Sequence, residues 1–157
     1  MKFLVTKDLN YSRLYAYLIA SVISVIFIYL ILDTVLHAYV IGTDISSIKT
    51  TLLGNEESFE EPILIDSILL QVHIDLFMTL FSLLILSSVY IRFNAKSPIV
   101  KPLVHILFLL GVFTPIFLLG VYFWNEVFIY LWIAGFLLWH GMGTILSIII
   151  LRSLDFK

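Results

Sequence analysis

Six ionisable side chains inside the long apolar segments of this 157-residue chain are the first candidates for chemistry. They are Asp33, His37, His73, Asp75, His105 and His140. Ionisable groups at membrane depth are rare, and they usually face the protein interior, pair with one another or mark a functional site. Imidazole and carboxylate groups together also form the ligand set that Zn, Fe and Mn accept.

Asp33 and His37 are four residues apart, near the end of the first apolar segment. On a helix this spacing puts both side chains on one face. A carboxylate one turn away can hold one ring nitrogen of the histidine and leave the other nitrogen for a metal or a proton. The alternative is that both residues lie in the headgroup zone and cap the end of the helix.

The second apolar segment carries polar residues on two faces. Gln71, Asp75, Thr79 and Ser82 follow one another at helical spacing, whereas His73 falls on nearly the opposite face. A helix that is polar on two faces cannot present both to lipid. We therefore expect it to be packed on both sides, or to offer one face to a partner chain.

The last apolar segment places His140 on one face with Gly143, Thr144 and Ser147. Small residues at these positions let another helix, or a flat ligand, approach the backbone closely. A packing seam crossed by a hydrogen bond from His140 is the alternative. His105 lies at the start of its segment and is expected at the membrane interface.

The composition shows that these segments belong to a membrane protein. The chain is 61% hydrophobic and only 13% charged, whereas soluble domains are about a quarter charged. It has no cysteine, which excludes disulfides, thiolate metal sites and iron–sulfur clusters. It also lacks a phosphate-binding glycine loop and a basic patch suited to nucleic acid. A soluble enzyme is excluded.

Four segments are long enough to cross a bilayer, which requires about 20 apolar residues. They cover residues 14–37, 63–91, 103–123 and 127–151. We predict an all-α polytopic membrane protein, a four-helix up-down-up-down bundle that forms a single transmembrane domain over 1–157. An acidic external loop, 38–62, is expected to contain a short interfacial helix that ends at Gly54. Pro115 should kink the third span, and Trp132 is assigned to an interfacial aromatic belt.

The basic residues predict the orientation of the bundle. All but Lys49 flank the spans on one side: Lys2, Lys7, Arg13, Arg92, Lys96, Lys101, Arg152 and Lys157. Cytoplasmic loops carry the excess of lysine and arginine, so both termini should be cytoplasmic. This pattern favours a multi-pass protein of the bacterial inner (cytoplasmic) membrane.

Four helices with one histidine each, together with several glycines in the last two spans, resemble the membrane-bound four-helix b-type cytochromes. The resemblance covers the architecture of the whole chain and includes no linear motif. It implies a haem b ligated by His73 and His140, with His37 as a substitute for either. Counting residues from the basic anchors puts His73 about 28 Å and His140 about 18 Å from the inner face, so tilt or stagger must close the gap. The resemblance further implies electron transfer with a quinone or a redox partner protein, by a membrane oxidoreductase or its subunit.

Two other hypotheses stay open at this point. One is a non-haem Zn, Fe or Mn site, or a proton site, built from Asp33, His37, His73, Asp75 and His140. The other is a cofactor-free accessory or assembly subunit, whose partners are the lipid bilayer and either a larger membrane complex or further copies of itself.

Overall fold

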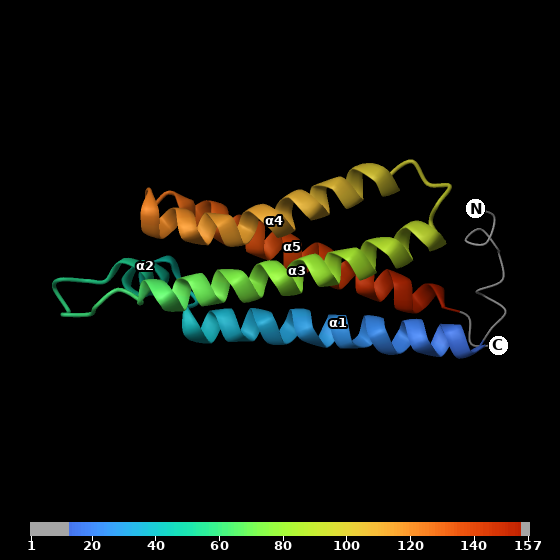
Figure 1. Cartoon of the computed structure of the whole chain (residues 1–157), viewed down its shortest axis with the longest axis horizontal. Coiled ribbons are helices and arrows are strands. Elements are labelled where there is room, and N and C mark those ends of the chain that lie inside the picture. The colour runs from blue at the N-terminus through green and yellow to red at the C-terminus, as the bar shows by residue number, and fades with distance from the viewer. Residues whose placement is uncertain (1–12, 155–157) are drawn as a thin grey trace.

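The structure is a computed structural model that describes residues 13–154, and this part of the chain is all-helical. It contains α1 (Arg13–Val40), α2 (Ile45–Leu53), α3 (Ile65–Phe93), α4 (Val100–Phe123) and α5 (Phe128–Ser153). The four long helices are each apolar and long enough to cross a membrane. They run alternately up and down as one elongated bundle (Figure 1). The predicted polytopic all-α fold is therefore confirmed.

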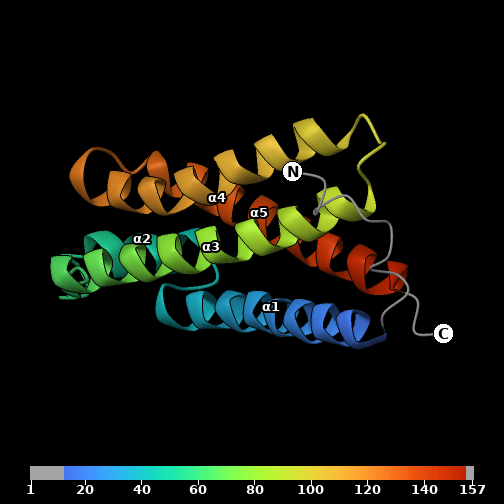
Figure 2. The same ribbon diagram turned by 45° about the vertical axis from the view of Figure 1, so that its right-hand side comes forward.

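The order of packing follows the lengths of the loops. Helix α3 packs against α4, and α4 against α5, whereas α1 packs mainly against α5. Short connections force the last three helices to be sequential neighbours, while the long connection through α2 lets α1 dock elsewhere. The beginning of α1 and the end of α5 lie at the same end of the bundle (Figures 1 and 2).

Glycines allow the helices to approach closely. A Cβ on Gly143 of α5 would lie 3.0 Å from Leu30 Cδ1 of α1, and one on Gly135 would lie only 2.4 Å from Thr114 Oγ1 of α4. The side chains of neighbouring helices therefore occupy the space that a larger residue would take. At Gly143 the approaching group is helix α1, and not a flat ligand.

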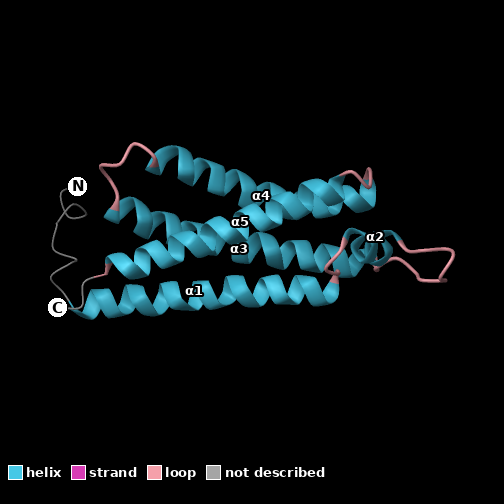
Figure 3. Ribbon diagram, turned by 180° about the vertical axis from the view of Figure 1, so that it is seen from behind, coloured by secondary structure: helices cyan, strands magenta, loops and turns pink. Residues whose placement is uncertain are grey.

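The segment between α1 and α3 forms the predicted short helix. Asp44 caps α2 by accepting a hydrogen bond from Ser47 N at 3.0 Å, while Ser47 Oγ accepts from Asp44 N, which completes a capping box. Gly54 ends the helix with φ of 79°, a value that favours glycine. Helix α2 lies at the end of the bundle opposite the beginning of α1 (Figure 3), where Lys49 Nζ is 2.5 Å from Glu126 Oε2 of the α4–α5 connection.

The interior of the bundle is arranged in layers along its length. One buried apolar cluster occupies the end near α2 and includes Ile48, Leu52 and Leu118. A second occupies the opposite part and includes Ile23, Leu86 and Ile150. Between these clusters lies what we term the polar layer: Asp33, His37, Asp75, Thr79, Thr114 and His140. Apolar side chains thus separate the polar layer from both ends of the bundle.

Candidate metal centre

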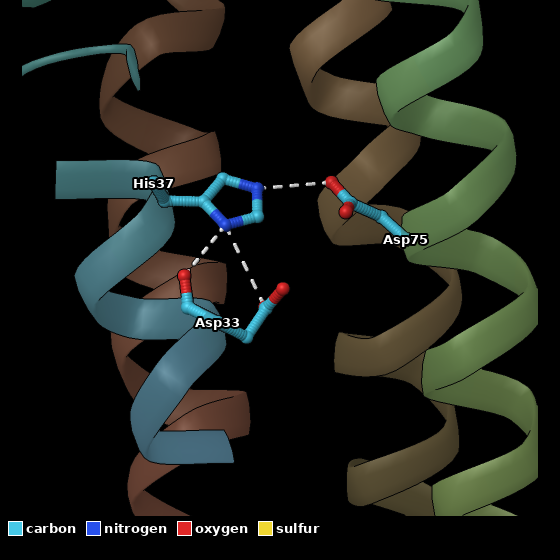
Figure 4. A group of neighbouring side chains, drawn as sticks. All are labelled: Asp33, His37 and Asp75. Atoms are coloured by element: carbon cyan, nitrogen blue, oxygen red, sulfur yellow. Dashed lines mark hydrogen bonds and ion pairs between the residues drawn. The ribbon is translucent and has the colours of Figure 1, made fainter. Parts of the chain in front are cut away.

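Helix α1 supplies two neighbouring side chains to the polar layer. The helix continues to Val40, three residues beyond the predicted end, so His37 lies within the helix and does not cap it. His37 is only 3% exposed, and the side chain of Asp33 is 10% exposed. The i,i+4 spacing places both on the face of α1 that points toward α3 and α5 (Figure 4).

His37 forms a bridge from α1 to α3. Its Nε2 atom lies 3.1 Å from Asp75 Oδ2, and its Nδ1 atom lies 2.9 Å from the backbone carbonyl of Asp33 (Figure 4). A carbonyl oxygen can only accept, so Nδ1 carries a hydrogen and donates it. The Nε2 atom is therefore the one that faces the carboxylate and is available to a proton or a metal ion.

Gln71 holds the carboxylate of Asp75 from one turn earlier on α3. Its Nε2 atom donates to Asp75 Oδ1 at 2.7 Å and lies 3.3 Å from His37 Nε2. The amide therefore orients both partners of the α1–α3 bridge. Gln71, Asp75, Thr79 and Ser82 all point toward the interior, as their helical spacing predicts.

His140 of α5 forms the second bridge to α1. Its Nε2 atom lies 2.8 Å from Asp33 Oδ2, and its Nδ1 atom donates to the carbonyl of Phe136 at 2.9 Å. Both histidines thus use Nδ1 to bond the carbonyl four residues earlier and direct Nε2 at a carboxylate of another helix. Two imidazole–carboxylate pairs, His37–Asp75 and His140–Asp33, meet in one buried layer.

Aromatic rings enclose the histidines. The ring centroid of Phe136 lies 4.7 Å from that of His37 and 3.9 Å from that of His140, and Trp132 lies 6.2 Å from His37. Trp132 is only 4% exposed, so its assignment to an interfacial belt was wrong. It packs against the polar layer because it shares a helix face with Phe136, one turn away. These rings form an apolar wall beside the two histidines.

Three side chains come together closely enough to bind one metal ion. A ligand atom from each of Asp33, His37 and Asp75 lies within 4.8 Å of the other two. Around a tetrahedral ion with bonds of 2.0–2.2 Å, neighbouring ligand atoms are separated by roughly 3.3–3.6 Å. The 3.1 Å separation of His37 Nε2 and Asp75 Oδ2 is already close to this value. The carboxylate of Asp33 lies beside the other ring nitrogen, with Oδ2 3.6 Å from His37 Nδ1, so it would have to turn toward an ion bound to Nε2.

The structure does not bring His73 into the site. His73 is exposed on the face of α3 opposite Asp75, and His105 is exposed near the start of α4, where its Nδ1 bonds the carbonyl of Lys101 at 3.0 Å. His140 is buried instead and directs its Nε2 atom at Asp33 of α1. The implied ligation of one haem by His73 and His140 therefore has no support in the geometry. The two histidines that do meet carboxylates are His37 and His140.

Sequence reasoning missed two contributions to the site. The backbone carbonyls of Asp33 and Phe136 fix the histidine tautomers, and the aromatic wall includes Trp139 as well as Trp132 and Phe136. Trp132 and Phe136 lie eight and four positions before His140, a spacing that signals a shared helix face, whereas Trp139 is adjacent to His140 in the sequence and carried no such signal.

Comparison with known proteins identifies the family of the chain. Its family model describes a transmembrane helical domain and matches residues 42–157. Helix α1 lies outside the matched residues, whereas Asp75 and His140 lie inside them. No curated protein and no solved structure matches the chain. A match over this share of the sequence shows that the chain belongs to the Aq_1264_TM family of transmembrane helical domains.

Proposed function

We propose that this membrane protein binds a divalent transition-metal ion, Zn²⁺, Fe²⁺ or Mn²⁺, within the bundle. Asp33, His37 and Asp75 are the ligands, and His140 orients Asp33 from behind. The observation that carries the proposal is the convergence of these three ligand atoms within 4.8 Å in a buried layer. If the termini are cytoplasmic, as the basic residues predict, the ion lies in the half of the membrane nearer the external side.

The charge of the layer supports this assignment. Two carboxylates lie here, and among the described residues no lysine or arginine pairs with either of them. Two uncompensated negative charges in an apolar interior are strongly unfavourable. A divalent ion supplies the whole compensating charge, and both Nε2 atoms are already oriented as metal-binding histidines are, with Nδ1–H bonded to a carbonyl.

A proton site is the second candidate function, and the short contacts favour it. A nitrogen and a carboxylate oxygen separated by 2.8 or 3.1 Å share a hydrogen bond only if a proton lies between them. The two bridges can each hold one such proton. A metal ion and a proton then compete for the same Nε2 lone pair of His37.

Metal analysis of the purified chain decides between these functions. The protein is purified in lipid nanodiscs, stripped with a chelator, reloaded with Zn²⁺, Mn²⁺ or Fe²⁺ and analysed for bound metal. We expect one ion per chain in the wild type and in His105→Ala, and less than a tenth of that in His37→Ala and Asp75→Asn.

The competition with protons gives a second readout. Metal binding should release protons and weaken as the pH is lowered, because the ligands must be deprotonated. Binding of less than a tenth of an ion per chain to the wild type under all these conditions would refute the metal site and leave the proton site. Equal loading of the wild type and of both ligand variants would show that the metal binds elsewhere.

A further inference from the structure

A small cavity inside the polar layer adjoins two of the three proposed ligands, Asp33 and Asp75. Its volume is about 10 Å³. Polar groups from all four long helices line it: Asp33, Asp75, Thr79, Thr114, Trp139 and His140. A cavity of roughly this volume accommodates one water molecule, provided that polar partners surround it. This cavity has both the size and the polarity that a single water molecule requires.

Trp139 provides an independent reason to expect an oxygen ligand here. The residue is 1% exposed, and its indole Nε1 has no hydrogen-bond partner among the described residues. Buried donors without a partner are rare in native proteins, and leaving one unsatisfied costs about 1–3 kcal/mol. The indole nitrogen can only donate, so its missing partner must be an acceptor. Because Trp139 forms part of the cavity wall, a ligand in the cavity can supply that acceptor.

We propose that this cavity is the binding position of a small oxygen ligand, water or hydroxide, which completes the metal centre. The inference rests on the proposed metal site and deepens it. One lone pair of the oxygen binds the ion, the other accepts the Trp139 indole hydrogen, and a water hydrogen donates to a carboxylate. The centre then has three protein ligands and one exchangeable position. This is the arrangement of an open metal site, in contrast to structural sites closed by four protein ligands.

The first test detects the water without any metal. The full chain in nanodiscs is labelled with ¹⁵N in its tryptophan indoles, and Trp139→Phe identifies the Trp139 signal. We expect magnetisation transfer between the Trp139 indole hydrogen and a long-lived water, although this side chain is buried. Trp124, which is 71% exposed, serves as the control for transfer from bulk solvent. Absence of transfer at Trp139, with transfer at Trp124, would refute the water site.

The second test asks whether the oxygen binds the metal. The Mn²⁺-loaded chain in ¹⁷O-enriched water should show a hyperfine coupling from one directly bound oxygen. Thr79→Ile, which adds a carbon atom to the cavity wall, should abolish the coupling and retain Mn²⁺, whereas the isosteric Thr79→Val should keep both. Thr114→Ile is the second filling variant if Thr79→Ile does not fold.

The outcomes separate the two proposals. Bound Mn²⁺ without ¹⁷O coupling in the wild type would refute the open position and leave the metal site intact. No bound Mn²⁺, Zn²⁺ or Fe²⁺ would refute the metal site together with the coordination of the oxygen. The indole measurement would then decide by itself whether the cavity holds a water.

Discussion

Replacement of Asp75 by asparagine should remove most of the stabilisation that metal binding gives to the fold. Asp75→Asn keeps the shape of the side chain and removes the charge of the ligand whose Oδ2 lies 3.1 Å from His37 Nε2. An ion that binds only the folded state, present at 100 times its Kd, stabilises that state by about 2.7 kcal/mol. For a chain of this size, that corresponds to a rise in Tm of roughly 5–11 °C.

The loss of metal-dependent stabilisation in Asp75→Asn can be calculated in the same way. Loss of a side chain that only hydrogen-bonds a metal ligand typically weakens metal affinity by about 10–100-fold. Loss of the charge of a ligand itself should therefore weaken the affinity by at least about 100-fold. At the same metal concentration, a 100-fold weaker site is about half occupied and contributes only about 0.4 kcal/mol. The rise in Tm should then fall to roughly 1–2 °C.

Thermal unfolding of the chelator-treated protein in nanodiscs, with and without Zn²⁺ or Mn²⁺, measures these shifts. His73→Ala is the matched control, because His73 lies on the same helix but on the exposed face. It should keep the full metal-dependent shift, although the sequence alone predicts His73 as a ligand. A full shift in Asp75→Asn, or its loss in His73→Ala, would refute the ligand assignment.

Two further predictions test the helix packing and the cap of α2. Gly135→Ala should lower the stability of the fold by about 1–3 kcal/mol through overpacking, because the new Cβ would meet Thr114 Oγ1 at 2.4 Å. Gly141→Ala is the control: a Cβ there would have nothing within 4 Å, so stability should stay unchanged or rise by up to about 1 kcal/mol. Chemical denaturation measures both variants, and equal effects on stability would contradict the prediction. Hydrogen bonds from the Ser47 backbone and side chain lower the pKa of Asp44. The stabilisation that the Asp44 cap gives to α2 is therefore fully present above pH 3.8 and is lost as the pH falls through the lowered pKa. The protection of the Ser47 amide against exchange, corrected for the intrinsic exchange rate at each pH, should therefore fall at acid pH in the wild type but not in Asp44→Ala, and the same fall in both would refute the cap.

Much of the fold could be predicted because a bilayer leaves few choices. About 20 apolar residues are needed to span its core, and every backbone polar group must be satisfied within the helix. The four spans were predicted to within three residues at each end, and α2 (Ile45–Leu53) was predicted from the glycine that stops it, Gly54. Loop lengths also predicted that the last three helices are sequential neighbours.

Only part of the site could be predicted, because which side chains meet depends on how each helix is rotated about its own axis. His73 and Asp75 are two positions apart, about 200° around the helix, so only one of them can face α1. Counting residues from the basic anchors also places Asp33 about 30 Å from the inner face, roughly 12 Å further than His140. Their side chains nevertheless lie 2.8 Å apart, so the helix ends cannot be level along the bundle. Periodicity identified the polar faces, and only the packing shows which faces meet.

The polar layer also explains how α1 is held in place. Lipid is as apolar as the outer surface of this helix, so the hydrophobic effect does not drive α1 onto the bundle, and close packing and polar contacts must do so. The specific contacts are the approach of Leu30 to Gly143 and the two bridges from His37 to Asp75 and from Asp33 to His140. The groups that would bind the ion are therefore the same groups that attach α1 to α3 and α5. Ligand binding and the docking of α1 should then be coupled, since whatever neutralises the carboxylates also removes the main electrostatic penalty for closing the bundle.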